Sequence, residues 1–205
     1  MTGWAKEKFG GMNSKMYTHV FELLLRLRGN YLWPAMWGNA FNEDDPENPR
    51  LADEYGIVMG TSHHEPMIRA QQEWKKHGVG AWNYATNPQG LNAFWQEGIK
   101  RNKNYESLVT MGMRGDGDEP MVEGGDMASN VKLLENIITD QRKILSENME
   151  KPVEKIPQLW ALYKEVKDYY DFGMKVPDDI TLLWADDNWG SLRHLPTAQE
   201  RKRSG

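Results

Sequence analysis

The chain has 205 residues, with 25 Lys and Arg against 30 Asp and Glu, and a formal net charge of −5. Hydrophobic residues make up 39%, which is enough for a core and excludes a wholly disordered chain. No run reaches the roughly 18 apolar residues of a transmembrane helix, and the mild acidity opposes a nucleic-acid partner. We therefore expect neither a membrane nor a nucleic acid as partner. The absence of cysteine excludes disulfides and thiolate chemistry, and the first residues lack the apolar region of a signal peptide.

Helical patterns alternate with five short apolar runs along the chain. The first helix is predicted to begin at Asn13 or Ser14, either of which can cap it, and to end at Gly29. The acidic, Pro- and Asn-rich segment 42–50 is predicted to be a loop. Further helices are predicted at 66–76, 91–104, 130–146 and 162–173, the third capped by Asn130. The predicted strands are 31–33, 56–61, 108–113, 157–161 and 180–185.

Continuous apolar strands between helices indicate a parallel sheet that is covered by helices. Nearly every predicted strand runs into polar or aromatic residues, which is typical of a (β/α)8 barrel with its site at the carboxyl ends of the strands. An open doubly wound sheet usually carries a Gly-rich phosphate turn, and none is present. The predicted fold is therefore α/β, a partial (β/α)8 (TIM-type) barrel of about five β/α units.

The run from Arg114 to Glu119 follows the third predicted strand. Alternate residues of an extended segment point the same way, so Arg114, Asp116 and Asp118 are expected to face one cavity. The guanidinium suits a substrate carboxylate, and the two carboxylates suit acid–base chemistry. The structural alternative is an Asp-Gly turn that ends the strand.

His63 and His64 follow the second predicted strand. Adjacent residues of a strand face opposite sides, so both can bind one metal ion only where the chain bends. The sequence has no H-E-x-x-H motif. We expect no metal and no cofactor, and hydrogen bonds from these histidines to hydroxyl groups instead. A metal-dependent, amidohydrolase-like barrel that uses His63, His64 and Asp118 is the alternative.

Asp186, Asn188 and Trp189 follow the fifth predicted strand. A carboxylate and an amide can bind sugar hydroxyl groups, and a Trp ring can stack on a sugar face. The alternative is an Asx-turn that begins the next loop. Glu165 stands where the fourth predicted strand passes into a helix. There it either interacts with the helix dipole or projects into the site.

Aromatic residues are frequent, with nine Trp and eight Tyr. Trp33 and Trp37 bracket a proline, where they either line the barrel or stack on a ligand. A barrel with several carboxylates, an arginine and aromatic walls favours glycoside hydrolysis, in which two carboxyl groups flank the scissile bond.

Four runs stand out along the chain: NYLWPAMW at 30–37, GTSHHEP at 60–66, MRGDGDE at 113–119 and DDNWG at 186–190. In this order they resemble family 115 of the glycoside hydrolases, the xylan α-1,2-glucuronidases. The likeness extends from Gly3 to about Pro196.

The resemblance implies an inverting hydrolase that removes α-1,2-linked glucuronic acid, or its 4-O-methyl ether, from xylan. It implies that residues 1–205 are a central fragment of a (β/α)8 catalytic domain, without its flanking strands and domains. The parent protein is expected to be a homodimer that is secreted or periplasmic. A catalytically inactive fragment that binds uronic acid or xylan is the alternative.

The resemblance also implies roles for individual residues. Asp118 and Glu165 are expected to share the acid–base chemistry, and Asp186 is a third catalytic candidate. Arg114 and the two histidines are expected to bind the carboxylate and hydroxyl groups of the uronic acid. The full set of expected substrate-binding residues is Arg114, His63, His64, Asn188, Trp189, Trp33 and Trp37.

Overall fold

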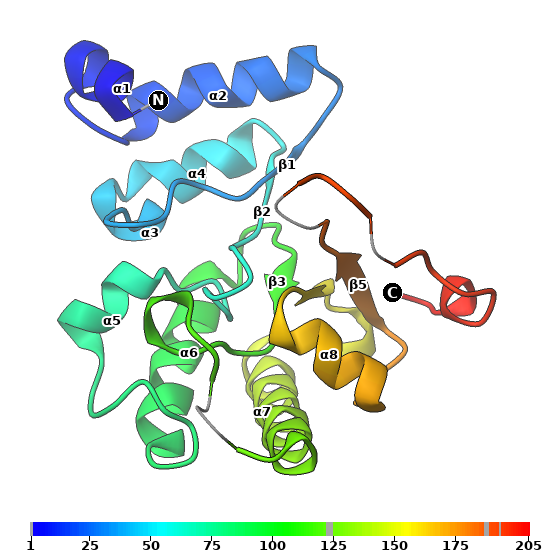
Figure 1. Ribbon diagram of the computed structural model, residues 1–205. Coiled ribbons are helices and arrows are strands. Elements are labelled where there is room, and N and C mark those ends of the chain that lie inside the picture. The colour runs from blue at the N-terminus through cyan, green and yellow to red at the C-terminus, as the bar shows by residue number, and fades with distance from the viewer. Residues whose placement is uncertain (1, 122–124, 187–188, 193) are drawn as a thin grey trace.

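Short parallel strands with helices around them make up the computed structural model of the chain, which describes residues 2–121, 125–186, 189–192 and 194–205 (Figure 1). A strand is present within, or within one residue of, each of the five predicted ranges. The strands are β1 (Tyr31–Leu32), β2 (Val58–Met59), β3 (Val109–Thr110), β4 (Gln158–Leu162) and β5 (Ile180–Trp184).

The strands are neighbours in the order in which they occur in the chain. β1 pairs with β2, and β3, β4 and β5 form a second sheet, with every pairing parallel. A parallel bridge between Met59 and Ser107 connects the two sheets. All the carboxyl ends of the strands therefore face the same way, as parallel pairing requires.

Helices lie on both sides of the strands, with α1 to α4 in one group and α5 to α8 in the other (Figure 1). No helix within the described ranges is long and apolar enough to cross a membrane. The helices are α1 (Thr2–Phe9), α2 (Ser14–Arg26), α3 (Phe41–Asp44), α4 (Glu47–Glu54), α5 (Gln71–His77), α6 (Pro88–Asn102), α7 (Met127–Asn148) and α8 (Glu165–Phe172).

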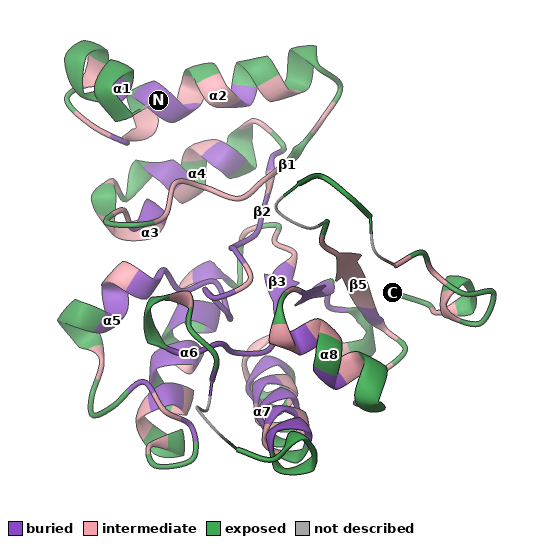
Figure 2. Cartoon of the chain, viewed as in Figure 1, coloured by how far each residue is buried: buried purple, intermediate pink, exposed green. Residues whose placement is uncertain are grey.

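Two hydrophobic clusters stabilise this arrangement. The smaller one packs α2 against α4 and β2, with Met16, Phe21 and Ile57 almost fully buried. The larger one joins α6 and α7 to β3 and β4, around Trp95 and Trp160. Figure 2 shows buried residues along α6 and α7 and exposed residues along much of α1 and α2. The apolar faces of α6 and α7 thus pack toward β3 and β4, as helical periodicity predicts.

The predicted loop at 42–50 is wrong, because α3 and the start of α4 occupy it. Pro46 precedes α4 with a φ of −62°, a value that suits the start of a helix. The buried Asn48 side chain donates a hydrogen bond to the Phe41 carbonyl and ties the two short helices together. A composition rich in Pro and Asn is thus compatible with helix starts as well as with loops.

The four later predicted helices also start at other residues, at Gln71, Pro88, Met127 and Glu165 in place of 66, 91, 130 and 162. Met67 and Ile68 have φ values of 59° and 56°, so the helix predicted from residue 66 begins only at Gln71. The Met67 N–H donates to the Thr110 carbonyl, and this bond to β3 holds the turn. Asp126, not Asn130, caps α7, since its carboxylate accepts from the Ser129 N–H.

A buried glutamine of α7 binds the backbone directly after β3. Gln141 accepts from the Gly112 N–H at 2.8 Å and donates to the Gly112 carbonyl at 2.7 Å. Gly112 has a φ of 91°, and a Cβ there would lie 2.7 Å from Trp160 Nε1, so only glycine fits. This contact fixes the direction in which the chain leaves β3 toward Arg114.

Candidate active site

The loops after β3 and β4 bring one arginine and two carboxylates together. Arg114 donates from Nε and Nη2 to the two oxygens of Glu165, at 2.9 and 2.8 Å. Its Nη1 pairs with the carboxylate of Asp118 and also donates to the Asp118 carbonyl. The Arg114 side chain is 2% exposed, and both carboxylates are 17% exposed. The two carboxylates therefore lie at different edges of one buried guanidinium.

His63, from the loop after β2, joins the same group. Its Nε2 lies 2.8 Å from Asp118 Oδ1, and its Nδ1 lies 3.1 Å from the Ser62 hydroxyl. Burial lowers the pKa of His63 and outweighs the opposing effect of Asp118. The neutral ring then donates its Nε2–H to Asp118 and accepts the Ser62 hydroxyl at Nδ1.

The pKa of Asp118 is lowered from its ordinary value. Burial alone raises this pKa, but the hydrogen bond from His63 and the charge of Arg114 outweigh it. Asp118 is therefore ionised at neutral pH and can accept a proton.

Asp116 does not share the cavity with Arg114 and Asp118, so the prediction that the three face one way is wrong. Residues Asp116–Asp118 form a 3-10 turn, in which Gly117 and Asp118 have φ values of 69° and 68°. This turn sends the exposed Asp116 side chain to Gln71, whose Nε2 donates to it at 2.8 Å. The extended geometry on which the prediction depends ends at Gly115.

Trp37 and His64 stack beside this group. Their ring centroids are 4.8 Å apart with an angle of 24° between the planes. Trp37 is 60% exposed, whereas His64 is buried, and neither ring nitrogen of His64 has a hydrogen-bond partner within the described ranges. Burial, with the neighbouring His63, lowers the pKa of His64 to about 4. The exposed indole face can stack on a sugar, and the buried His64 ring packs beneath it.

Tyr163 and Lys164, which sequence reasoning missed, complete the wall next to α8. The Tyr163 ring is 4.5 Å from the His63 ring, and the Arg114 guanidinium lies 5.6 Å from its centroid. The Lys164 ammonium is 3.5 Å from Asp118 Oδ2. The available signal was their position, since they stand directly between β4 and Glu165.

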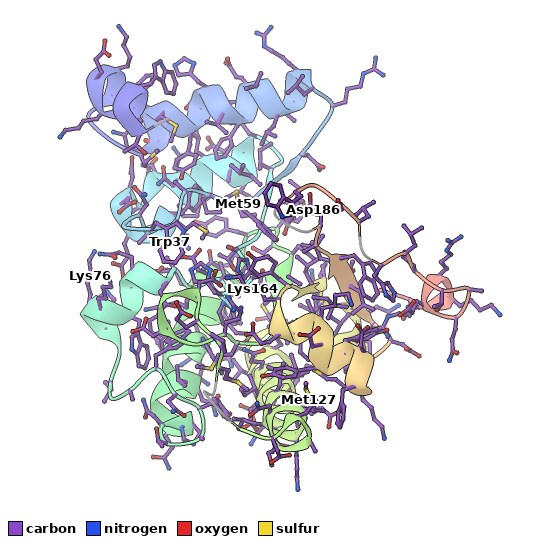
Figure 3. All side chains as sticks on the ribbon, viewed as in Figure 1. Trp37, Met59, Lys76, Met127, Lys164 and Asp186 are labelled. Atoms are coloured by element: carbon purple, nitrogen blue, oxygen red, sulfur yellow. The ribbon has the colours of Figure 1, made fainter. Side chains whose placement is uncertain are left out.

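The remaining predicted residues are Asp186, Asn188, Trp189 and Trp33. Asp186 is exposed after β5 (Figure 3). In the part of the chain that is described, it forms no hydrogen bond or ion pair with the group around Arg114. Trp189 is 90% exposed, and Asn188 lies outside the described residues. Trp33 is half-buried, and its indole N–H donates to the Tyr31 hydroxyl.

Three of the site residues have the donor types of a metal centre. Ligand atoms of His63, His64 and Asp118 lie within 4.8 Å of one another. However, Arg114 and Lys164 both form ion pairs with Asp118, and their positive charges repel a divalent cation. The charges around Asp118 therefore suit an anionic or polar organic ligand better than a metal ion.

Glu65 is a buried carboxyl beside the site, and its Oε1 accepts from the Gln71 N–H at 3.0 Å. Burial outweighs this bond and raises the pKa of Glu65 to about 7. A carboxyl with a raised pKa stabilises the fold fully below its unfolded pKa of 4.5, and this contribution is lost as the pH rises through 7.

Glu65→Gln is therefore expected to remove a pH-dependent loss of stability. Between pH 4 and pH 8, the free energy of unfolding of the variant should rise by about 3 kcal/mol relative to that of wild type. Urea unfolding at the two pH values measures this gain. An equal difference between the two proteins at both pH values would contradict the assignment.

The model of glycosyl hydrolase family 115 matches residues 1–205. The chain is similar to the solved structure of BtGH115A, described as a novel family GH115 4-O-methyl-alpha-glucuronidase with specificity for decorated arabinogalactans, with a TM-score of 0.94 and 39% identity. The match covers 100% of this chain and 28% of that protein. A search of curated proteins gave no match. The chain therefore belongs to glycosyl hydrolase family 115, as its four sequence runs indicate.

Proposed function

We propose that the chain provides part of the active site of an α-glucuronidase, which removes α-1,2-linked glucuronic acid or its 4-O-methyl ether from xylan with inversion. The observation that carries the proposal is the pair of carboxylates, Asp118 and Glu165, at different edges of Arg114. The family and the described activity of the similar protein support it. Because that protein is described as specific for decorated arabinogalactans, this polysaccharide is the second substrate to test.

Inversion requires a general acid and a general base about 6.5–9.5 Å apart, with a water molecule between the base and the sugar. Asp118 suits the base, since its lowered pKa keeps it ionised. As the base, it removes a proton from the water whose oxygen bonds to the anomeric carbon. Glu165 then donates a proton to the leaving glycosidic oxygen as the old bond breaks. Arg114 positions both carboxylates, because it binds each of them.

The substrate walls are aromatic. Trp37 offers an exposed face over His64, and Tyr163 lies against His63. We assign the sugar ring to the space beside these rings, and we propose that the two histidines line this space. Asp186, Asn188, Trp189 and Trp33 are proposed to contact the same sugar or the adjoining polysaccharide.

We further propose that the five parallel strands are an arc of a (β/α)8 barrel. Strands that are consecutive in the chain are neighbours in the sheets, and the site lies after the carboxyl ends of β2, β3 and β4. Both are properties of such barrels. In this proposal residues 1–205 are a fragment of the catalytic domain of a larger, homodimeric protein that is secreted or periplasmic. The match to 28% of the similar protein supports the larger size.

Proton NMR of the chain with 4-O-methylglucuronoxylan oligosaccharides, and separately with decorated arabinogalactan, tests the proposal. Early appearance of the β-anomer of the free uronic acid is the expected result. Early appearance of the α-anomer would contradict inversion, and release from arabinogalactan alone would contradict xylan as the substrate. Binding of uronic acid without any release would favour the alternative of a sugar-binding fragment, for which the exposed Trp37 face is the supporting observation.

A further inference from the structure

A glucuronic acid substrate brings a carboxylate into the site, and this charge needs a cationic partner. Arg114 is the cation at the centre of the site, but it is 2% exposed and already donates to Glu165 and Asp118. A substrate carboxylate can reach it only by displacing one of the two carboxylates. The catalytic arrangement therefore leaves Arg114 poorly placed for binding the uronate.

Lys164 is the second cation of the site. Its side chain is 47% exposed, and its ammonium lies 3.5 Å from Asp118 Oδ2 and 5.1 Å from the centroid of the Tyr163 ring. In the view of Figure 3 Lys164 lies in the middle of the molecule, next to the start of α8. An ammonium at this distance from one carboxylate keeps N–H donors for a second one. Lys164 thus combines access for a ligand with direct proximity to the acid–base pair.

The backbone at Lys164 is held in an uncommon conformation. Its φ and ψ are 50° and −128°, a region that costs a residue with a Cβ about 1–3 kcal/mol. The residues on each side of Lys164 already contact other site residues: Tyr163 packs on His63, and Glu165 binds Arg114. This turn between β4 and α8 places three consecutive side chains at one site, and Lys164 is the one of the three that solvent reaches most.

The charges of the group point to the same assignment. Arg114 and Lys164 balance Asp118 and Glu165, and burial keeps His63 and His64 largely neutral. A general acid must be protonated before the reaction, and this leaves one positive charge without a counterpart. A uronate restores neutrality, whereas a neutral hexose does not. The group therefore favours an anionic sugar at the step at which the acid holds its proton.

We propose that the Lys164 ammonium binds the carboxylate of the glucuronic acid substrate and so distinguishes uronic acids from neutral sugars. This inference rests on the proposed function, because it assumes that the sugar lies beside Asp118. It assigns the anionic group to a residue for which sequence reasoning gave no role. Arg114 is then a positioning residue for the two carboxylates.

The test measures binding of sodium glucuronate and of glucose to the 205-residue chain by NMR titration. Wild type is expected to prefer glucuronate. Lys164→Met should weaken glucuronate binding by about tenfold or more, as expected for loss of a charged hydrogen-bond partner, and should leave glucose binding unchanged. Lys164→Arg should retain the preference. Lys167→Met is the matched control, since it removes the same charge from α8 at a residue that pairs with Asp171.

An unchanged glucuronate preference in Lys164→Met, or equal binding of the two sugars by wild type, would overturn the proposal. Thermal unfolding of each variant shows whether it is folded, and Lys164→Arg retains the side-chain charge where folding of the Met variant is impaired. The readout is separate from hydrolysis. If the chain prefers glucuronate through Lys164 but releases no uronic acid, only the proposed function is contradicted. If the chain hydrolyses the substrate and its glucuronate preference does not depend on Lys164, only this inference is contradicted.

Discussion

Asp118→Asn is expected to abolish nearly all release of uronic acid while the chain stays folded. The amide cannot take a proton from water, and loss of a general acid or base lowers a rate by about 10²- to 10⁴-fold. Its carbonyl oxygen can still accept the bonds that Arg114 and His63 donate to Asp118. Binding of glucuronate should therefore survive. Rates of uronic acid release and NMR titration with glucuronate measure the two properties separately.

Asp116→Asn is the matched control for this experiment. Asp116 lies two residues away on the same turn, and its side chain accepts from Gln71 instead of facing Arg114. The control should keep most of the wild-type rate. An Asp118→Asn variant with wild-type activity would remove Asp118 from the acid–base chemistry. Equal losses in both variants would show that the turn, and not the Asp118 carboxylate, is what matters.

Arg114→Met is expected to produce the largest loss of stability, about 3–5 kcal/mol at pH 7. The guanidinium is almost fully buried, and its removal leaves Asp118 and Glu165 as two largely buried negative charges without their main partner. Without the guanidinium, burial raises the pKa of Asp118 in the folded variant. Urea unfolding of wild type and variant at pH 7 measures the loss.

The dependence of this loss on pH identifies its cause. Carboxyls with raised pKa values in the folded state favour folding at low pH, so the deficit of Arg114→Met should shrink as the pH falls toward 4. The triple variant Arg114→Met, Asp118→Asn, Glu165→Gln removes the buried charges of this group together and should recover most of the stability. A deficit that stays constant with pH would point to lost packing of the arginine stem instead.

Elements with a strong local pattern could be predicted from the sequence. The runs around β4 and β5 are mostly apolar, and every residue of β4 is buried, which is the environment that such runs predict. The cap at Asn13 was also predictable, since its side chain accepts from the Met16 N–H. The position of Asp118, Glu165 and the histidines at strand ends followed from the parallel order of the strands.

The residues that could not be predicted depend on contacts between distant parts of the chain. Nothing in the sequence around Lys164 indicates a positive φ, because this conformation is imposed by packing of Tyr163 and Glu165 on either side. The late start of α5 depends on a bond from Met67 to β3, more than 40 residues away. The turn at Asp116 similarly depends on Gln71 of α5. Periodicity and local propensity do not contain this information.

The strands beside the site are very short, with two residues each in β2 and β3. Side-chain hydrogen bonds therefore hold backbone segments that a longer strand pairing would otherwise hold. Gln141 holds the Gly112 backbone, and the Trp82 indole N–H holds the Arg114 carbonyl at 2.8 Å. Neither side chain belongs to the reacting group. A survey of inactive variants should therefore find positions in the helical layer and in remote loops, where a lost anchor shifts the carboxylates by fractions of an ångström. Distance from the substrate is, for this domain, a poor guide to which substitutions are silent.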